Sequence, residues 1–144
     1  MARASETIAR IQRNGWAPVR WAHHPDGIKR LIHDAGFRPK AKGCYTNCGK
    51  LLVACLDTEY ESDLTYCEGV FRRGQFGVAH AWLRYRGEIV DLTIVDGNAS
   101  QYEQQLEMTP ERFAKQCYRV GNFGPFVPPD PRLEALAMLT ATRC

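Results

Sequence analysis

Three residues with complementary chemistry follow one another along this chain: Cys44, His80 and Asp91. Cys44 follows Gly43 at the predicted start of an apolar helix. Unpaired backbone N–H groups and the positive end of the helix dipole stabilise an anion there. A thiolate at such a position is expected to have a lowered pKa. We therefore interpret Cys44 as a nucleophile, His80 as its general base and Asp91 as the acid that orients the histidine.

Two alternatives for these residues remain open. Cys48 lies one helical turn after Cys44 and could be the nucleophile instead, although packing in the core is its more common role. A zinc site formed by cysteines and a histidine is the chemical competitor, with Cys44, Cys48, Cys67 and His80 as its ligands. The spacing of these residues matches the usual zinc motifs poorly, so we predict neither a metal nor a cofactor.

Helical spacing and capping residues predict the elements that position this chemistry. Helices are expected at residues 5–13, 26–35, 44–57, 109–118 and 133–140. Alternating apolar residues predict strands at residues 64–71, 76–85 and 88–94, and residues 97–105 are expected to form a polar loop. The predicted fold is therefore α+β, with a central helix that carries the cysteine packed on a small antiparallel sheet.

A tight turn at Arg86 and Gly87 fixes the register of the last two predicted strands. If these two residues form the whole loop, Tyr85 pairs with Glu88. Paired residues project to the same face of a sheet, as do residues two apart along a strand. One face then carries His80, Trp82, Asp91 and Thr93.

This register predicts a specific geometry for the candidate site. We expect the helix that begins at Cys44 to pack on the sheet face that carries His80. The Cys44 sulfur should then lie within about 4 Å of one ring nitrogen of His80. A carboxylate oxygen of Asp91 should lie within about 3.2 Å of the other ring nitrogen.

Composition limits the classes of protein to consider. The chain has 144 residues, 44% of them hydrophobic and 24% charged, and a net charge of +3. These values predict one globular domain, and they imply neither disorder nor nucleic-acid binding. No apolar run is long enough for a membrane span or a signal peptide, so we expect a cytoplasmic protein. In that compartment the six cysteines are expected to be thiols rather than a disulfide framework.

An ordered set of motifs resembles the transglutaminase-like branch of the papain-like cysteine protease superfamily. The set comprises Gly43-Cys44 with Cys48, then Tyr66-Cys67-Glu68-Gly69-Val70, His80-Ala81-Trp82 and Asp91-Leu92-Thr93. The resemblance covers residues 42–94 and implies one papain-like domain over residues 1–144, with that core and helical flanks at both ends. It also implies a Cys44-His80-Asp91 catalytic triad.

The resemblance implies acyl chemistry on an amide or thioester. Hydrolysis of an amide in a peptide or protein is the expected reaction, as in a cysteine protease. The backbone N–H of Cys44, with Asn47 or Trp82, is expected to hold the oxyanion or support the site. Transglutaminase or deamidase activity is the alternative, as is an inactive binding or inhibitor module of the same fold. The sequence predicts no nucleic-acid or membrane partner, and it leaves the oligomeric state open.

Overall fold

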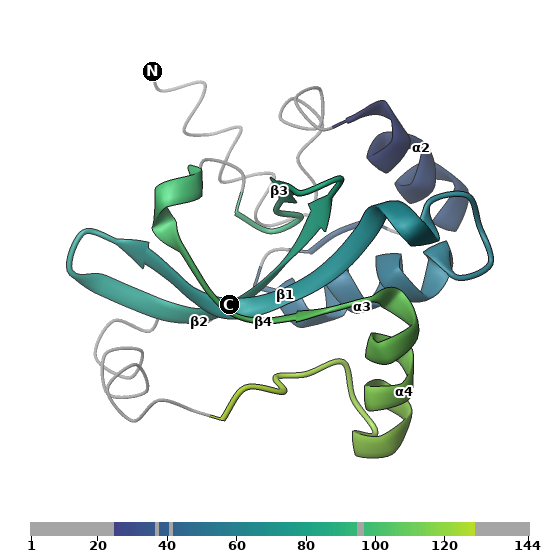
Figure 1. Ribbon diagram of the computed structural model, residues 1–144. Helices are drawn as coiled ribbons and strands as arrows, with labels where there is room; N and C mark the ends of the chain where they lie inside the picture. The colour runs from purple at the N-terminus through teal and green to yellow at the C-terminus, as the bar shows by residue number, and fades with distance from the viewer. Residues whose placement is uncertain (1–24, 37, 41, 95–96, 129–144) are drawn as a thin grey trace.

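The structure is a computed structural model that describes residues 25–36, 38–40, 42–94 and 97–128 (Figure 1). Its main elements are α2 (Asp26–Ala35), α3 (Cys44–Cys55), β1 (Leu64–Arg73), β2 (Phe76–Tyr85), β3 (Glu88–Val90), β4 (Tyr102–Met108) and α4 (Pro110–Val120). Two short 3₁₀ helices, η2 (Glu61–Asp63) and η3 (Ala99–Gln101), precede β1 and β4. The helices expected at residues 5–13 and 133–140 lie outside the described residues.

The sheet has four antiparallel strands in the order β3-β2-β1-β4. β1 and β2 form a long hairpin, visible in Figure 1 as the curved ribbon that extends beyond the other strands. β2 and β3 are joined by the two-residue turn predicted from the sequence, since Tyr85 pairs with Glu88 and Leu83 with Val90. Arg86 and Gly87 both have positive φ, as a type I′ turn requires. The predicted α+β class and the register of this hairpin are confirmed.

Two details of the predicted strands are wrong. The last predicted strand, residues 88–94, ends at Val90 because Asp91 accepts the backbone N–H groups of Thr93 and Ile94 and turns the chain. The predicted polar loop at residues 97–105 instead contains η3 and the first half of β4. β4 is an edge strand with a mostly exposed polar surface, so its residues lack the apolar alternation that marks a buried strand.

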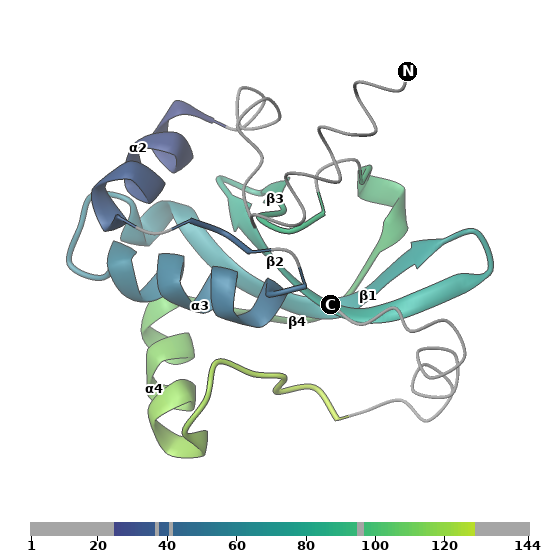
Figure 2. The same ribbon diagram turned by 180° about the vertical axis from the view of Figure 1, so that it is seen from behind.

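The core lies between α3 and one face of the sheet, and Figure 2 shows α3 in front of the strands. Four small or apolar residues of that face join the α3 side chains in the core: Ala81, Leu83, Val90 and Leu92. The β1–β2 register places His80 and Trp82 on the opposite face. The prediction that α3 packs on the His80 face is therefore wrong. The Ala81 face offers the helix the apolar side chains of Leu83 and Val90, although it also carries the buried Glu68, which pairs with Ala81.

α4 begins at the predicted cap and extends to Val120, slightly beyond the predicted end at residue 118. The Thr109 hydroxyl accepts the backbone N–H of Arg112, Pro110 occupies the first turn, and Gly121 adopts the left-handed conformation just after the helix. Phe113 of α4 is fully buried and packs against Tyr66 of β1, with ring centroids 4.4 Å apart.

Within the described ranges, none of the helices has the length and apolarity needed to cross a membrane.

Candidate active site

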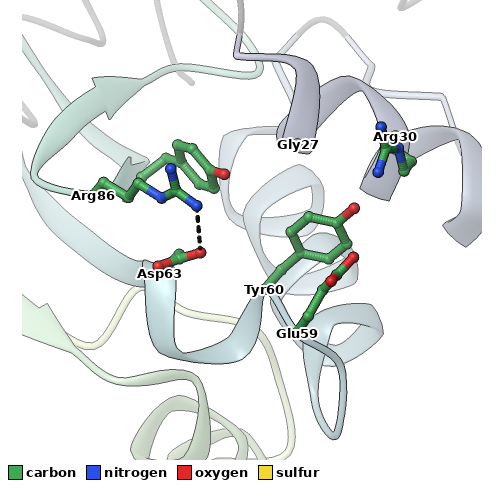
Figure 3. Close-up of a pocket in the computed structure, with 7 residues that line it drawn as sticks. Gly27, Arg30, Glu59, Tyr60, Asp63 and Arg86 are labelled. Atoms are coloured by element: carbon green, nitrogen blue, oxygen red, sulfur yellow. Dashed lines mark hydrogen bonds and ion pairs between the residues drawn. The ribbon is translucent and has the colours of Figure 1, made fainter.

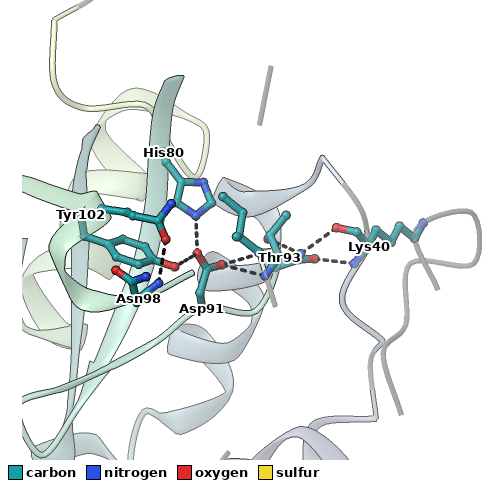
Figure 4. A network of polar contacts seen from close by, with 9 residues as sticks. Lys40, His80, Asp91, Thr93, Asn98 and Tyr102 are labelled. Atoms are coloured by element: carbon teal, nitrogen blue, oxygen red, sulfur yellow. Dashed lines mark hydrogen bonds and ion pairs between the residues drawn. The ribbon is translucent and has the colours of Figure 1, made fainter. Parts of the chain in front are cut away.

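His80 and Asp91 form the centre of the candidate site. His80 Nε2 lies 2.6 Å from Asp91 Oδ2, within the predicted hydrogen-bond distance (Figure 4). Both residues are buried, with His80 0% and Asp91 5% exposed. The hairpin register accounts for this contact, because it places Asp91 diagonally next to His80 just beyond the last paired residue of β3. The predicted pairing of the histidine with the acid is confirmed.

Four donors converge on the Asp91 carboxylate. Oδ1 accepts the backbone N–H groups of Thr93 at 2.8 Å and Ile94 at 2.9 Å. Oδ2 accepts the Tyr102 hydroxyl at 2.7 Å in addition to His80. Because an ionised carboxylate only accepts hydrogen bonds, Nε2 of His80 must carry the proton in this arrangement. In a neutral ring Nδ1 is then the basic nitrogen, which is the one that a general base needs to present.

The first turn of α3 is tied to this pair through Asn47. Its Nδ2 donates to Thr93 Oγ1 at 2.9 Å and to the Lys40 carbonyl oxygen at 2.8 Å, and its Oδ1 accepts the Lys40 backbone N–H at 2.9 Å. Figure 4 shows the resulting run of polar contacts from His80 through Asp91 and Thr93 to Lys40. Asn47 therefore supports the site by holding the loop before α3 against the turn that contains Asp91.

An open edge of the sheet explains how α3 approaches His80 from the opposite face. β3 pairs with β2 only at residues 83–85, and in the described part of the chain no strand continues this pairing at His80. Residues 91–94 leave the sheet at this edge and reach Asn47 of α3. Cys44 lies three residues before Asn47, which places both on adjacent positions of one helix face. The first turn of α3 thus lies beside the His80–Asp91 pair although the helix body packs on the other face.

Cys44 is the first residue of α3, as its position after Gly43 predicts. Its side chain is fully buried. It is disulfide-bonded in this structure, which differs from the expected free thiol. Four of the remaining cysteines are free: Cys48, Cys55, Cys67 and Cys117. The sixth, Cys144, lies outside the described residues. The predicted distance from the Cys44 sulfur to His80 stays a prediction, and a nucleophilic Cys44 requires the reduced form.

Cys48 has the environment of a core cysteine rather than of a nucleophile. It is fully buried, and burial raises the pKa of its thiol well above the ordinary value, with further contributions from Asp91, Cys67 and Glu68. Burial likewise raises the pKa of Cys55 and of Cys67 to about 12. A thiol with a raised pKa carries little thiolate near neutral pH. These thiols therefore fit the predicted packing role, and the environment of Cys48 disfavours it as the alternative nucleophile.

Trp82 and two neighbouring aromatic side chains surround His80. The Trp82 ring is stacked on His80 with centroids 6.0 Å apart and meets Tyr102 edge to face at 5.0 Å, while Phe71 lies 5.9 Å from His80.

The two side chains expected to hold an oxyanion differ in their available donors. Both Nδ2 hydrogens of Asn47 are already donated, whereas Trp82 Nε1 is buried and has no hydrogen-bond partner within the described residues. Of the two side chains expected to hold an oxyanion, Trp82 is the one with an uncommitted donor.

The sequence interpretation did not include Tyr102, which contacts the candidate site directly. It lies at the first residue of β4, in the segment predicted to be a loop. Tyr102, Leu106 and Met108, at even positions among polar residues, are a weak and incomplete signal for a strand. This signal is interrupted by a β-bulge opposite Glu68 and Gly69, which changes the face of the residues that follow.

A separate hollow of about 260 Å³ lies at the Tyr85 end of β2 (Figure 3). Its lining consists of Gly27, Arg30, Glu59, Tyr60, Asp63, Tyr85 and Arg86. The charges of two arginines and two acidic residues offset one another in this lining, and Arg86 forms an ion pair with Asp63 at 3.4 Å. The hollow contains none of the predicted site residues.

Among the residues that the structure describes, no group of three or more histidine, cysteine or acidic side chains could hold a metal ion.

Comparisons with known proteins add no further assignment. No protein-family model, no curated protein and no solved structure matches this chain.

Proposed function

We propose that the chain is a thiol-dependent acyl-transfer enzyme that hydrolyses an amide of a peptide or protein through Cys44, His80 and Asp91. The observation that carries this proposal is the buried contact of 2.6 Å between His80 Nε2 and Asp91 Oδ2, beside the first turn of α3. The contact leaves Nδ1 as the basic nitrogen. The resemblance of residues 42–94 to transglutaminase-like proteins supports the same assignment.

The proposed reaction starts from reduced Cys44. His80 Nδ1 accepts the thiol proton, and the thiolate attacks the carbonyl carbon of the amide. The imidazolium, stabilised by Asp91, then gives its proton to the leaving nitrogen as the C–N bond breaks and a thioester remains. Water attacks the thioester while His80 accepts its proton, and the released thiolate recovers that proton. An amine in place of water gives transamidation, and a glutamine side chain as substrate gives deamidation.

Alkylation of reduced Cys44 tests this proposal without knowledge of the substrate. Iodoacetamide labelling across pH, read by peptide mass spectrometry, should show Cys44 reacting well below pH 8.5, and His80→Ala or His80→Asn should abolish this reactivity. His33→Ala is the matched control, since His33 is exposed on α2. A Cys44 profile with a midpoint near 8.5 that His80→Ala leaves unchanged would contradict the proposal.

A binding or inhibitor module of the same fold is the second candidate. The observation that favours it is the complete burial of Cys44 and His80, together with the disulfide at Cys44. Capture with the Cys44→Ala protein, followed by mass spectrometry, would identify a bound peptide or protein. A biological effect that disappears in Cys44→Ser while partner binding survives supports the enzyme, and an effect that Cys44→Ser leaves intact supports the binding module.

A further inference from the structure

The hydroxyl of Tyr102 lies where it can control the orientation of the candidate acid. It donates to Asp91 Oδ2 at 2.7 Å, and the same oxygen accepts His80 Nε2 at 2.6 Å. Nothing in the motifs that make the chain resemble transglutaminase-like proteins includes this residue, because they end before β4. We propose that Tyr102 is a positioning residue that fixes the Asp91 carboxylate and, through it, the tautomer of His80. The proposal rests on the proposed function for its consequence at Cys44.

Several features of the chain bring this hydroxyl to Asp91. The β-bulge opposite Glu68 and Gly69 shifts the register of β4, so that Tyr102 pairs with Phe71. Its ring packs against Phe71 at 5.1 Å and Trp82 at 5.0 Å. Gly97 leaves space for the hydroxyl, since a Cβ at that position would lie 2.6 Å from the Tyr102 oxygen. The strand register, the aromatic packing and the space at Gly97 together place the Tyr102 hydroxyl next to Asp91.

The effect of that O–H group follows from how Asp91 is held. Two backbone N–H groups fix Oδ1, so the remaining freedom of the carboxylate concerns Oδ2 and its two donors. A second donor on Oδ2 restricts rotation of the carboxylate and keeps this oxygen directed at His80 Nε2. Loss of the hydroxyl leaves His80 as the only described donor to Oδ2.

The test compares Tyr102→Phe with Tyr118→Phe, which removes the same hydroxyl from a side chain that is 93% exposed. Nitrogen-15 NMR of the histidine rings reports the tautomer of His80 directly and does not depend on catalysis. We expect a protonated Nε2 in the natural protein and in Tyr118→Phe, and a second tautomer in Tyr102→Phe. Gly97→Ala, which displaces the hydroxyl but keeps the ring, should change the spectrum in the same direction.

The second measurement is the alkylation rate of reduced Cys44 as a function of pH. Tyr102→Phe should lower the rate near pH 7 by about tenfold, as expected for loss of one hydrogen bond to a charged group, whereas Tyr118→Phe should not. Changed His80 spectra with an ordinary thiol profile in every protein would support the positioning role and contradict the proposed function. His80 spectra that are identical in Tyr102→Phe and Tyr118→Phe would overturn the positioning role.

Discussion

At the scale of single residues, Asp91 has the largest number of partners in the candidate site. Both of its oxygens are saturated by donors from a strand, a turn and a second strand. Asp91→Asn replaces one oxygen with an NH₂ group that must face two of these donors. We expect the free energy of unfolding in urea to fall by about 2 kcal/mol or more, because buried donors lose their acceptor. Reduced Cys44 should also lose its reactivity near neutral pH.

Asp34→Asn provides the control for this prediction. Asp34 is exposed near the end of α2, so the same substitution should change the free energy of unfolding by no more than about 0.5 kcal/mol. Equal unfolding curves for the two variants would show that the network around Asp91 contributes nothing specific to stability.

Glu68 is a second buried acid, and its carboxylate holds the segment after α4. Its oxygens accept the backbone N–H groups of Phe126 at 2.9 Å and Val127 at 3.1 Å, and the Tyr66 hydroxyl at 2.6 Å. Glu68→Gln removes the charge and one acceptor, so we expect faster amide hydrogen exchange at Phe126 and Val127. Glu107→Gln on β4 is the control and should leave these two amides unchanged. Equal protection in both variants would contradict the assigned role of Glu68.

At the scale of elements, the pairing of β1 with β4 depends on Gly69. A Cβ at this position would lie 1.9 Å from the backbone carbonyl oxygen of Glu103, beside the β-bulge. Backbone cannot move aside as a side chain can, so Gly69→Ala should displace β4 and with it Tyr102. We expect a loss of about 2 kcal/mol or more in the free energy of unfolding, together with a reduced reactivity of Cys44.

Gly49 of α3 offers a comparison in which the same substitution meets a side chain. A Cβ there would lie 2.4 Å from a ring carbon of Phe123, which can rotate or shift. The helical preference of alanine over glycine, about 1 kcal/mol, offsets part of that cost. Gly69→Ala should therefore destabilise the protein more than Gly49→Ala in urea unfolding. The reverse order would show that β4 adapts more readily than the segment around Phe123.

At the scale of the whole molecule, the sequence predicts the register of a hairpin better than the sheet face on which a helix packs. The hairpin at residues 86–87 was predictable because its turn residues and strand alternation specify one register, and that register in turn predicts the contact of His80 with Asp91. The face on which α3 packs was not predictable in this way. Both faces of β2 carry apolar residues, and each face of the complete sheet also carries a buried polar residue, Glu68 on one and His80 on the other. Strand alternation alone therefore does not select the face for α3.

The contribution of Tyr102 in β4 to the candidate site could not be predicted, for a different reason. Tyr102 approaches Asp91 only through long-range pairing of β4 with β1, and a β-bulge interrupts the alternation from which an edge strand could be predicted. The disulfide at Cys44 was likewise outside what spacing alone predicts, since Cys44, Cys48 and Cys55 belong to one helix and cannot pair with each other within it.

Buried thiols should make the whole protein sensitive to alkaline pH. The pKa of Cys48 lies well above its ordinary value, and those of Cys55 and Cys67 are raised to about 12, in each case mainly by burial. In the unfolded chain such thiols lose their protons near pH 8.5, whereas the folded protein keeps them. Unfolding therefore releases protons above this pH. The stabilisation is complete below about pH 8.5 and is lost progressively as the pH rises toward 12.

Cys48→Ala tests this dependence, because it removes one of these titrating groups. Urea unfolding under reducing conditions, at pH values between about 7.5 and 10.5, should show a smaller loss of stability with pH in this variant. The expected difference in slope is up to about 1.4 kcal/mol per pH unit above pH 8.5. The cavity left by the substitution lowers stability equally at every pH, so the slope separates titration from packing. Cys117→Ala, at a partly buried thiol, should change the slope less, and equal slopes in Cys48→Ala and the natural protein would contradict the prediction.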